Sequence, residues 1–202
     1  MARPSRAHEK RIELVAAARQ AVIERGVLDL RLRDVAEQAE MSAGSVLYYF
    51  PTLAELLREV QREAVERFCA DREAAALEES DPRRRLTTMI RGGLPAGRDD
   101  ELCVLLYELG VYARRDPAYA AQHIRLYERQ VAIYTAIIEA GAARGMFEPV
   151  CDPTTVARNL VTLEDGYGLH VTHAVPTVST AEAERLIRAY AADAVRCDLE
   201  GF

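Results

Sequence analysis

The chain has 202 residues, of which 50% are hydrophobic and 29% are charged, and its formal net charge is -6. This apolar content excludes an intrinsically disordered chain, and no run approaches the roughly 20 apolar residues of a membrane-spanning helix. The length suits one domain, or a small domain joined to a larger one. The charged N-terminus does not lead into the apolar core of a signal peptide, so we expect a cytoplasmic protein.

Charge is distributed unevenly along the chain. Residues 1–50 contain eight basic and seven acidic residues, whereas the remainder contains 18 basic and 25 acidic ones. A basic N-terminal arm on an acidic body favours a polyanionic partner at that end. A solvated helix face gives a similar pattern, so charge alone does not decide between the two interpretations.

The cysteines and histidines form no recognisable site. Cys69, Cys103, Cys151 and Cys197 are far apart, and no C-x-x-C pair or zinc-finger spacing occurs. This predicts reduced, structural cysteines, with a redox switch as the alternative. We expect no metal and no cofactor.

The sequence predicts an all-α fold. Strand patterns are nearly absent, and eight prolines divide the chain into segments of helix length. Apolar residues at i, i+3 and i+4 spacing then predict nine helices. They lie near residues 6–25, 32–39, 43–49, 52–78, 82–92, 98–114, 117–141 (or to 145), 153–174 and 179–198. The segment 98–114 is apolar nearly all round, so we expect it to be buried on every side.

The two short helices, near 32–39 and 43–49, are joined by a three-residue turn, as in a helix-turn-helix. Ala36 provides the small side chain that their crossing needs, and Ser42 is placed to cap the second helix. A small core is expected from Leu32, Val35, Met41 and Val46.

Within residues 30–57 the chain contains Arg33-Asp34-Val35-Ala36, Ala39, Met41-Ser42, Gly44 and Tyr48-Tyr49-Phe50. In this pattern it resembles the TetR family of one-component transcriptional regulators. The resemblance is specific over about residues 8–60; beyond them it rests on helix order and on the segment 163–169. It implies a helix-turn-helix DNA-binding domain over residues 1–51 and a ligand-binding and dimerisation domain over residues 52–202.

The resemblance implies which residues contact DNA. Ser42, Ala43, Gly44 and Ser45 are expected at the start of the recognition helix, in the major groove. Tyr48 and Tyr49 are expected to contact phosphates, as is the Ser42 hydroxyl; alternatively, the two tyrosines only cover the small core. The basic candidates are Arg3, Arg6, Arg31 and Arg33, of which the first two either enter a minor groove or belong to a solvated tail.

Three residues depart from the family pattern. Glu40 replaces the usual turn glycine, which costs roughly 1–2 kcal/mol if that residue must be left-handed. Ala43 and Leu53 stand where lysines are common. Fewer phosphate contacts predict a shallower dependence of DNA binding on salt.

By the same resemblance, helices between about residues 52 and 175 enclose an effector cavity. The candidate lining residues are Met89, Cys103, Tyr107, Glu108, Tyr112, Tyr127, Asn159, Glu164 and His170. Glu108 and Glu164 together would favour a cationic ligand. Ordinary helix packing and ion pairing explain each of these residues equally well.

The two apolar helices at the end of the chain predict a homodimer through a four-helix bundle. The expected interface residues are Leu160, Leu163, Tyr167, Leu186, Ile187, Tyr190 and Ala194. In the alternative, both helices are wholly internal to a monomer.

None of the common nucleotide-binding or hydrolase motifs occurs, so we do not expect an enzyme. The resemblance implies a DNA-binding regulator, in the common case a repressor. A small-molecule effector would release it from a palindromic operator by moving the long helix that begins at Thr52. The alternative is an all-α ligand-binding or interaction module that keeps the helix-turn-helix shape without specific DNA binding.

Overall fold

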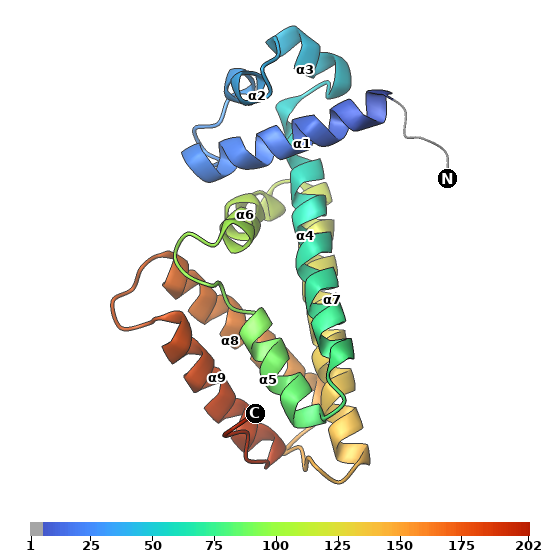
Figure 1. Cartoon of the computed structure of the whole chain (residues 1–202), viewed down its shortest axis with the longest axis vertical. Coiled ribbons are helices and arrows are strands. Elements are labelled where there is room, and N and C mark those ends of the chain that lie inside the picture. Colours follow the sequence, from blue (N-terminus) through green and yellow to red (C-terminus); the bar gives the residue numbers. More distant parts are fainter. Residues whose placement is uncertain (1–5) are drawn as a thin grey trace. The chain divides into compact units, whose positions relative to one another are not determined.

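The computed structural model describes residues 6–202, and every regular element in this range is helical (Figure 1). The α-helices are α1 (Arg6–Arg25), α2 (Leu32–Gln38), α3 (Ala43–Tyr49), α4 (Leu53–Glu78), α5 (Pro82–Gly92), α6 (Glu101–Gly110), α7 (Pro117–Ala143), α8 (Pro153–Thr172) and α9 (Thr180–Val195). A short 3₁₀ helix, η1 (Val111–Arg114), follows α6. The predicted all-α fold is confirmed.

Local capping signals explain where several helices begin. Pro82 and Pro153 each occupy the first turn of a helix, where a missing N–H costs nothing. The preceding Asp81 carboxylate accepts a hydrogen bond from the Arg83 N–H at 2.8 Å, and Asp152 accepts one from Thr155 at 3.0 Å. These caps satisfy N–H groups that the helices cannot pair internally.

The chain forms two compact units. One contains the residues up to Glu66 together with Val104–His123, and the other contains Arg67–Cys103 together with Ile124–Phe202. These units differ from the expected functional domains, 1–51 and 52–202, because the long helices α4 and α7 each contribute to both units. The functional division therefore stays a prediction.

In the first unit, α1, α2 and α3 contact one another and enclose a small apolar core (Figure 1). Val35 and Val46 are fully buried in it, whereas Leu32 and Met41 are only half-buried. Phe50, just after α3, is also buried. One face of α3 therefore packs against the core, and the opposite face is exposed to solvent.

The second unit has a larger core built from α5, α7, α8 and α9. Its fully buried side chains include Leu86, Ile90, Tyr134, Ile138, Leu160 and Ile187. Contacts join α9 to both α5 and α8. The buried polar residues Gln130 and Glu164 lie on two of these helices, α7 and α8.

One prediction about burial is wrong. The segment 98–114 is not buried on every side: α6 buries Cys103, Leu105 and Leu109, while Val111 in η1 is largely exposed. An apolar composition does not specify how many neighbours surround a helix. Among the helices of residues 6–202, none combines the length and apolar character needed to cross a membrane.

Candidate nucleic-acid interface and ligand cavity

The turn between α2 and α3 contains a left-handed glutamate. Glu40 has φ of 51°. Its N–H donates to the Glu37 carbonyl at 3.1 Å, and the Met41 N–H donates to the Ala36 carbonyl at 2.8 Å. This pair of bonds is the Schellman motif that normally ends in glycine. The chain therefore keeps the family's turn, and Glu40 takes the conformation in which a non-glycine residue is strained.

Ser42 caps α3 as the sequence predicts. Its Oγ accepts a hydrogen bond from the Ser45 N–H at 3.1 Å, and the two serine hydroxyl oxygens lie 2.8 Å apart. Both side chains are exposed. The cap thus fixes the start of α3 and holds two hydroxyl groups at the surface.

The exposed side of α3 presents small and apolar residues together with a tyrosine. Ala43, Gly44, Ser45 and Leu47 are exposed, and Tyr48 is exposed to 82%. The Tyr48 ring contacts the half-buried Tyr49 ring edge-on, with centroids 5.1 Å apart. Since Tyr48 projects outward, it does not cover the small core, whereas Tyr49 does so in part.

Basic residues lie on the elements next to α3. Three of the predicted basic contacts are exposed: Arg6, Arg31 and Arg33. The fourth, Arg3, lies outside the described residues. Asp34 is buried; it accepts the Arg31 backbone N–H at 2.7 Å and lies 3.4 Å from an Arg25 guanidinium nitrogen. Asp34 therefore orders the start of α2, and the Arg31 and Arg33 side chains remain at the surface.

Arg11 makes a contact that sequence reasoning missed. Its guanidinium lies 4.0 Å from the Phe50 ring centroid and donates to the Tyr49 carbonyl. This cation–π contact joins α1 to the end of α3. It anchors the helix that carries the candidate DNA contacts.

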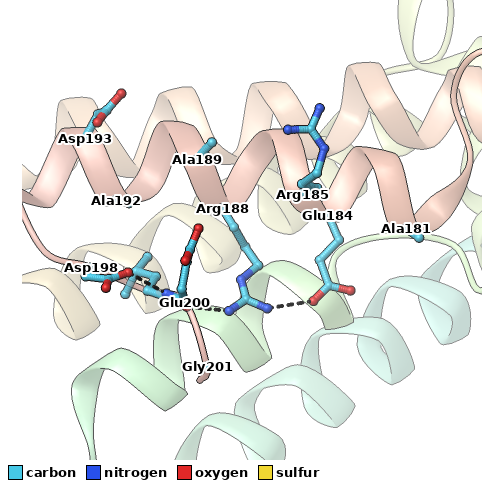
Figure 2. Close-up of a pocket in the computed structure, with 11 residues that line it drawn as sticks. Ala181, Glu184, Arg185, Arg188, Ala189, Ala192, Asp193, Asp198, Glu200 and Gly201 are labelled. Carbon is cyan, nitrogen blue, oxygen red and sulfur yellow. Dashed lines mark hydrogen bonds and ion pairs between the residues drawn. The ribbon is translucent and has the colours of Figure 1, made fainter.

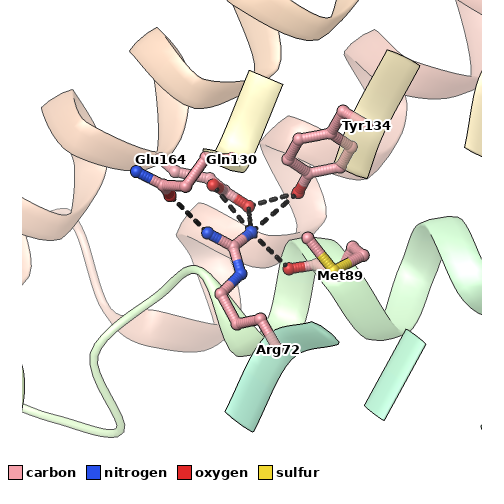
Figure 3. A network of polar contacts seen from close by, with 5 residues as sticks. All are labelled: Arg72, Met89, Gln130, Tyr134 and Glu164. Atoms are coloured by element: carbon pink, nitrogen blue, oxygen red, sulfur yellow. Dashed lines mark hydrogen bonds and ion pairs between the residues drawn. The ribbon is translucent and has the colours of Figure 1, made fainter. Parts of the chain in front are cut away.

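The second unit contains a buried ion pair (Figure 3). Arg72 of α4 is 3% exposed and Glu164 of α8 is 1% exposed, and Arg72 Nη2 lies 2.8 and 3.0 Å from the two Glu164 oxygens. Tyr134 donates its hydroxyl proton to the same carboxylate. Arg72 also donates to the Gln130 side-chain oxygen and, at 2.9 Å, to the Met89 carbonyl. Residues from α4, α5, α7 and α8 thus meet at one guanidinium.

Burial dominates the electrostatics of this cluster. It raises the pKa of the Glu164 carboxyl to about 7, even though the Arg72 charge opposes the shift. Burial also raises the pKa of the Cys103 thiol to about 12. Cys103 is therefore a neutral wall group, while the Arg72–Glu164 pair depends on its full set of hydrogen bonds.

A cavity of about 170 Å³ adjoins Arg72. Its walls come from α4, α5, the following loop and the start of α6; they include Phe68, Asp71, Arg72, Thr88, Leu94, Asp100 and Cys103. Within the described part of the chain, the buried Nε of Arg72 has no hydrogen-bond partner. An unpaired buried donor is costly, so this N–H favours an acceptor supplied by water or a ligand.

The predicted pocket residues do not lie together. Cys103 lines the cavity, and Met89 and Glu164 belong to the Arg72 cluster. Tyr127 packs against the core of the second unit, whereas Asn159 and His170 lie on the exposed surface of α8.

Three other predicted pocket residues belong to the first unit. The half-buried Glu108 accepts the Val27 N–H at 2.9 Å, Tyr112 contacts Tyr119, and Tyr107 is half-buried. Glu108 and Glu164 therefore each already have a protein partner, and Arg72 compensates the Glu164 charge.

Sequence reasoning also missed Arg72, although a signal exists. Arg72 follows Val65 and Cys69 and precedes Ala76 on the buried stripe of α4, at spacings of seven, three and four residues. A charged residue on a buried stripe indicates a buried pair or a ligand site. Its partners are far away in the sequence.

The surfaces of α8 and α9 revise the predicted dimer interface. Leu163, Tyr167, Leu186 and Tyr190 are half-buried, and Asn159 donates to the Tyr190 hydroxyl at 2.8 Å, which joins the two helices. Leu160, Ile187 and Ala194 are instead buried in the core of their own chain, so they cannot face a partner. Both helices also have exposed residues, so the alternative that they are wholly internal is wrong.

A wider groove of about 630 Å³ runs along α9 and the C-terminal segment (Figure 2). Arg188 donates to the Phe202 carbonyl at 2.9 Å and to the Leu199 carbonyl, and it lies 3.5 Å from Glu184. Arg188, one of the charged residues that line the groove, thus binds the chain's own end. Its observed role is to attach residues 199–202 to α9.

Two family models match the chain. Residues 14–60 match the model for bacterial regulatory proteins of the tetR family, and residues 82–196 match the C-terminal model of BetI-type transcriptional repressors. The first range contains the α2–α3 turn, and the second contains Glu164 and its partners Met89, Gln130 and Tyr134. The chain belongs to the TetR family of transcriptional regulators.

Solved structures agree with this TetR-family assignment. A TetR transcription regulator from Haloarcula marismortui is 26% identical, with a TM-score of 0.79 over 94% of this chain and 98% of that one. A Saccharomonospora viridis protein in complex with choline has a TM-score of 0.84 at 22% identity, over 90% and 95% of the chains. Bacillus subtilis FadR in complex with stearoyl-CoA has a TM-score of 0.72 at 16% identity, over 89% and 96%. No curated protein matches the chain in sequence.

TetR-family membership establishes the general function. The chain is a DNA-binding transcriptional regulator, and the model matched by its C-terminal part is that of a repressor. Members of the family bind DNA operators and small-molecule ligands and act as dimers.

Proposed function

We propose that this regulator is a homodimer in which α2 and α3 of each subunit bind one half of a palindromic operator. A small effector that binds in the Arg72 cavity is proposed to release the dimer from DNA. The exposed face of α3 supports the proposal of DNA binding. Ser42 caps the start of this helix, and Phe50 just after its end is buried in the core, so the helix is fixed at both ends. The proposed DNA-binding residues are Arg3, Arg6, Arg31, Arg33, Ser42, Ala43, Gly44, Ser45, Tyr48 and Tyr49.

The proposed contacts divide into two kinds. The exposed Tyr48 hydroxyl and the arginines suit phosphate oxygens, which position the protein. The small residues at the start of α3 allow close approach to base edges. Since Ala43 and the half-buried Leu53 provide no positive charge, we expect a shallower dependence of affinity on salt than lysines there would give.

The effector is proposed to be small and to carry an acceptor oxygen. A cavity of 170 Å³ holds about six water molecules at roughly 30 Å³ each, which is well below the usual size of drug-like sites. The Arg72 Nε donor suits an acceptor group, and Phe68 and Leu94 suit apolar carbon. The choline complex of the S. viridis protein shows that a relative with this fold can be crystallised with a molecule of that size class.

Release is proposed to act through α4. This helix begins at Leu53, directly after the DNA-binding segment, and also contributes Phe68, Asp71 and Arg72 to the cavity wall. A ligand that prefers a shifted position of α4 would favour a spacing of the two DNA-binding segments that does not fit the operator.

A binding selection tests the DNA proposal. The purified chain is incubated with a library of randomised duplexes, and the enriched sequence is assayed at increasing salt. We expect enrichment of a two-fold symmetric site whose affinity falls as salt rises, though less steeply than with lysines at positions 43 and 53. Failure to enrich any duplex would contradict the proposal and favour the all-α module without specific DNA binding.

A cavity-filling variant tests the effector proposal. Ala75→Leu adds bulk to the cavity wall without altering α3. A small-molecule extract that releases the natural protein from its operator should no longer release this variant. Equal release of both proteins would show that the effector binds elsewhere.

A further inference from the structure

The side chains of α3 restrict how this regulator can read bases. The helix consists of Ala43, Gly44, Ser45, Val46, Leu47, Tyr48 and Tyr49. None is charged and none carries an amide. The side chains that usually make paired hydrogen bonds with guanine or adenine are arginine, lysine, asparagine and glutamine. Without them, α3 has only hydroxyl groups and apolar side chains with which to distinguish bases.

Leu47 is the large apolar side chain on the exposed side of this helix. It is 42% exposed, whereas its neighbour Val46 is fully buried and fills the small core. Folding of the first unit therefore uses Val46 and leaves much of Leu47 in water. Single exposed leucines are common; Leu47 differs in lying on the very helix that is proposed to enter the major groove.

Ala43 extends the apolar surface around Leu47. The two residues are four positions apart on one helix, so their side chains are neighbours on the same face, and both are exposed. Ala43 adds a methyl group beside the branched end of Leu47. Gly44, one position further on, adds no side chain that would hold this surface away from DNA.

Thymine has the matching chemistry. In the major groove it alone among the four bases presents a methyl group, at C5, and apolar side chains contact that group directly. Burying a methyl group against a leucine stabilises the complex through the hydrophobic effect, with no need for a hydrogen bond. The apolar part of this surface, formed by Leu47 and Ala43, therefore favours thymine.

We propose that Leu47, with Ala43 beside it, is a specificity-determining residue that recognises the 5-methyl group of a thymine in each operator half-site. The proposal rests on the proposed function, in which α3 enters the major groove. It assigns a base preference to a residue that the family resemblance leaves without a role.

The test removes only the methyl group. In the duplex enriched from the randomised library, each thymine is replaced in turn by deoxyuridine, which keeps every hydrogen-bonding group. In each half-site we expect one thymine at which this replacement matters. Replacing it in one half-site should reduce affinity about fourfold, and replacing it in both half-sites should reduce affinity about fifteenfold. Replacement at the other thymines should have little effect.

A double-mutant cycle assigns the effect to Leu47. Leu47→Ala should bind the thymine duplex more weakly than the natural protein, and should bind the thymine and deoxyuridine duplexes equally well. The matched control is Leu28→Ala, which truncates a largely exposed leucine outside α3 and should keep the full preference for thymine.

The outcomes separate this inference from the function on which it rests. If a duplex is enriched but deoxyuridine changes affinity at no position, the thymine inference is wrong and DNA binding stands. If Leu47→Ala keeps the thymine preference, another residue reads the methyl group and the assignment is overturned. If no duplex is enriched, both proposals fail. The deoxyuridine series on the natural protein needs no variant, so a series without any loss of affinity overturns the inference even if Leu47→Ala is poorly folded.

Discussion

At the scale of single residues, Glu40 shows how a turn can be kept without its usual glycine. Its backbone is left-handed, and the two hydrogen bonds of the Schellman motif are both made. The strain of a left-handed non-glycine residue is therefore present in the folded state and is offset by packing in the rest of the first unit.

Glu40→Gly should relieve this strain. We expect the free energy of unfolding to rise by about 1 kcal/mol, less than the full steric cost because glycine also gains freedom in the unfolded chain. Urea denaturation measures the change. Glu40→Ala removes the carboxylate but keeps Cβ, so it should bring no comparable gain; an equal gain would mean that charge, not backbone strain, is responsible.

The Arg72–Glu164 pair depends on an equally local condition, which is the absence of a side chain at Gly93. A Cβ on Gly93 would overlap the Glu164 carboxylate. The loop after α5 therefore approaches α8 more closely than any other residue type would allow.

Gly93→Ala should destabilise the protein by roughly 1–3 kcal/mol, because the buried carboxylate must move and its hydrogen bonds to Arg72 and Tyr134 must lengthen. Gly97→Ala is the matched control, since nothing lies within 4 Å of a Cβ there. Thermal or urea unfolding compares the two variants. Equal stability of both would contradict the close approach at Gly93.

At the scale of elements, the helices were predictable because their signals are local. Prolines, caps and the 3.6-residue apolar period lie within each segment, so α3 and α5 match their expected ranges. The predicted ends of the last two helices, at residues 174 and 198, lie beyond the observed ends at Thr172 and Val195. The left-handed residues Ala174 and Arg196 end these two helices. A left-handed residue that is not glycine cannot be recognised from the sequence.

The candidate sites were less predictable because they depend on tertiary contacts. Arg72 meets partners that are 58 and 92 positions away, Gln130 and Glu164, and no local pattern pairs them. The predicted interface mixed both sides of α8 and α9, since an apolar periodicity does not reveal whether a face meets its own chain or a partner. The helix-turn-helix was more predictable, because its turn at Glu40 and its cap at Ser42 are close together in the sequence.

The half-buried surface of α8 and α9 carries the proposed dimer interface. Leu186→Glu places a charge on this surface, outside the core of the chain, and should convert the dimer into a monomer because a buried unpaired charge is strongly unfavourable. Analytical ultracentrifugation measures the mass. Leu77→Glu, at a leucine of α4 that is 80% exposed, should leave the dimer intact. A dimeric Leu186→Glu variant would place the interface elsewhere.

At the scale of the whole molecule, three parts of one chain act together in the proposed mechanism. α3 presents an uncharged reading surface, and α4 runs from the DNA-binding segment to the wall of a small cavity. The half-buried surface of α8 and α9 is the proposed site for the partner subunit. Homodimerisation matters because two recognition helices, about 34–36 Å apart or a multiple of it, are needed to read a palindrome.

Hydroxyl-radical footprinting of the enriched duplex tests this central claim most directly. The account predicts two protected half-sites related by two-fold symmetry, with centres about 10–10.5 base pairs apart or a multiple of that spacing, and loss of both in the monomeric Leu186→Glu variant. A single protected patch, or uniform weak protection that does not depend on sequence, would contradict it.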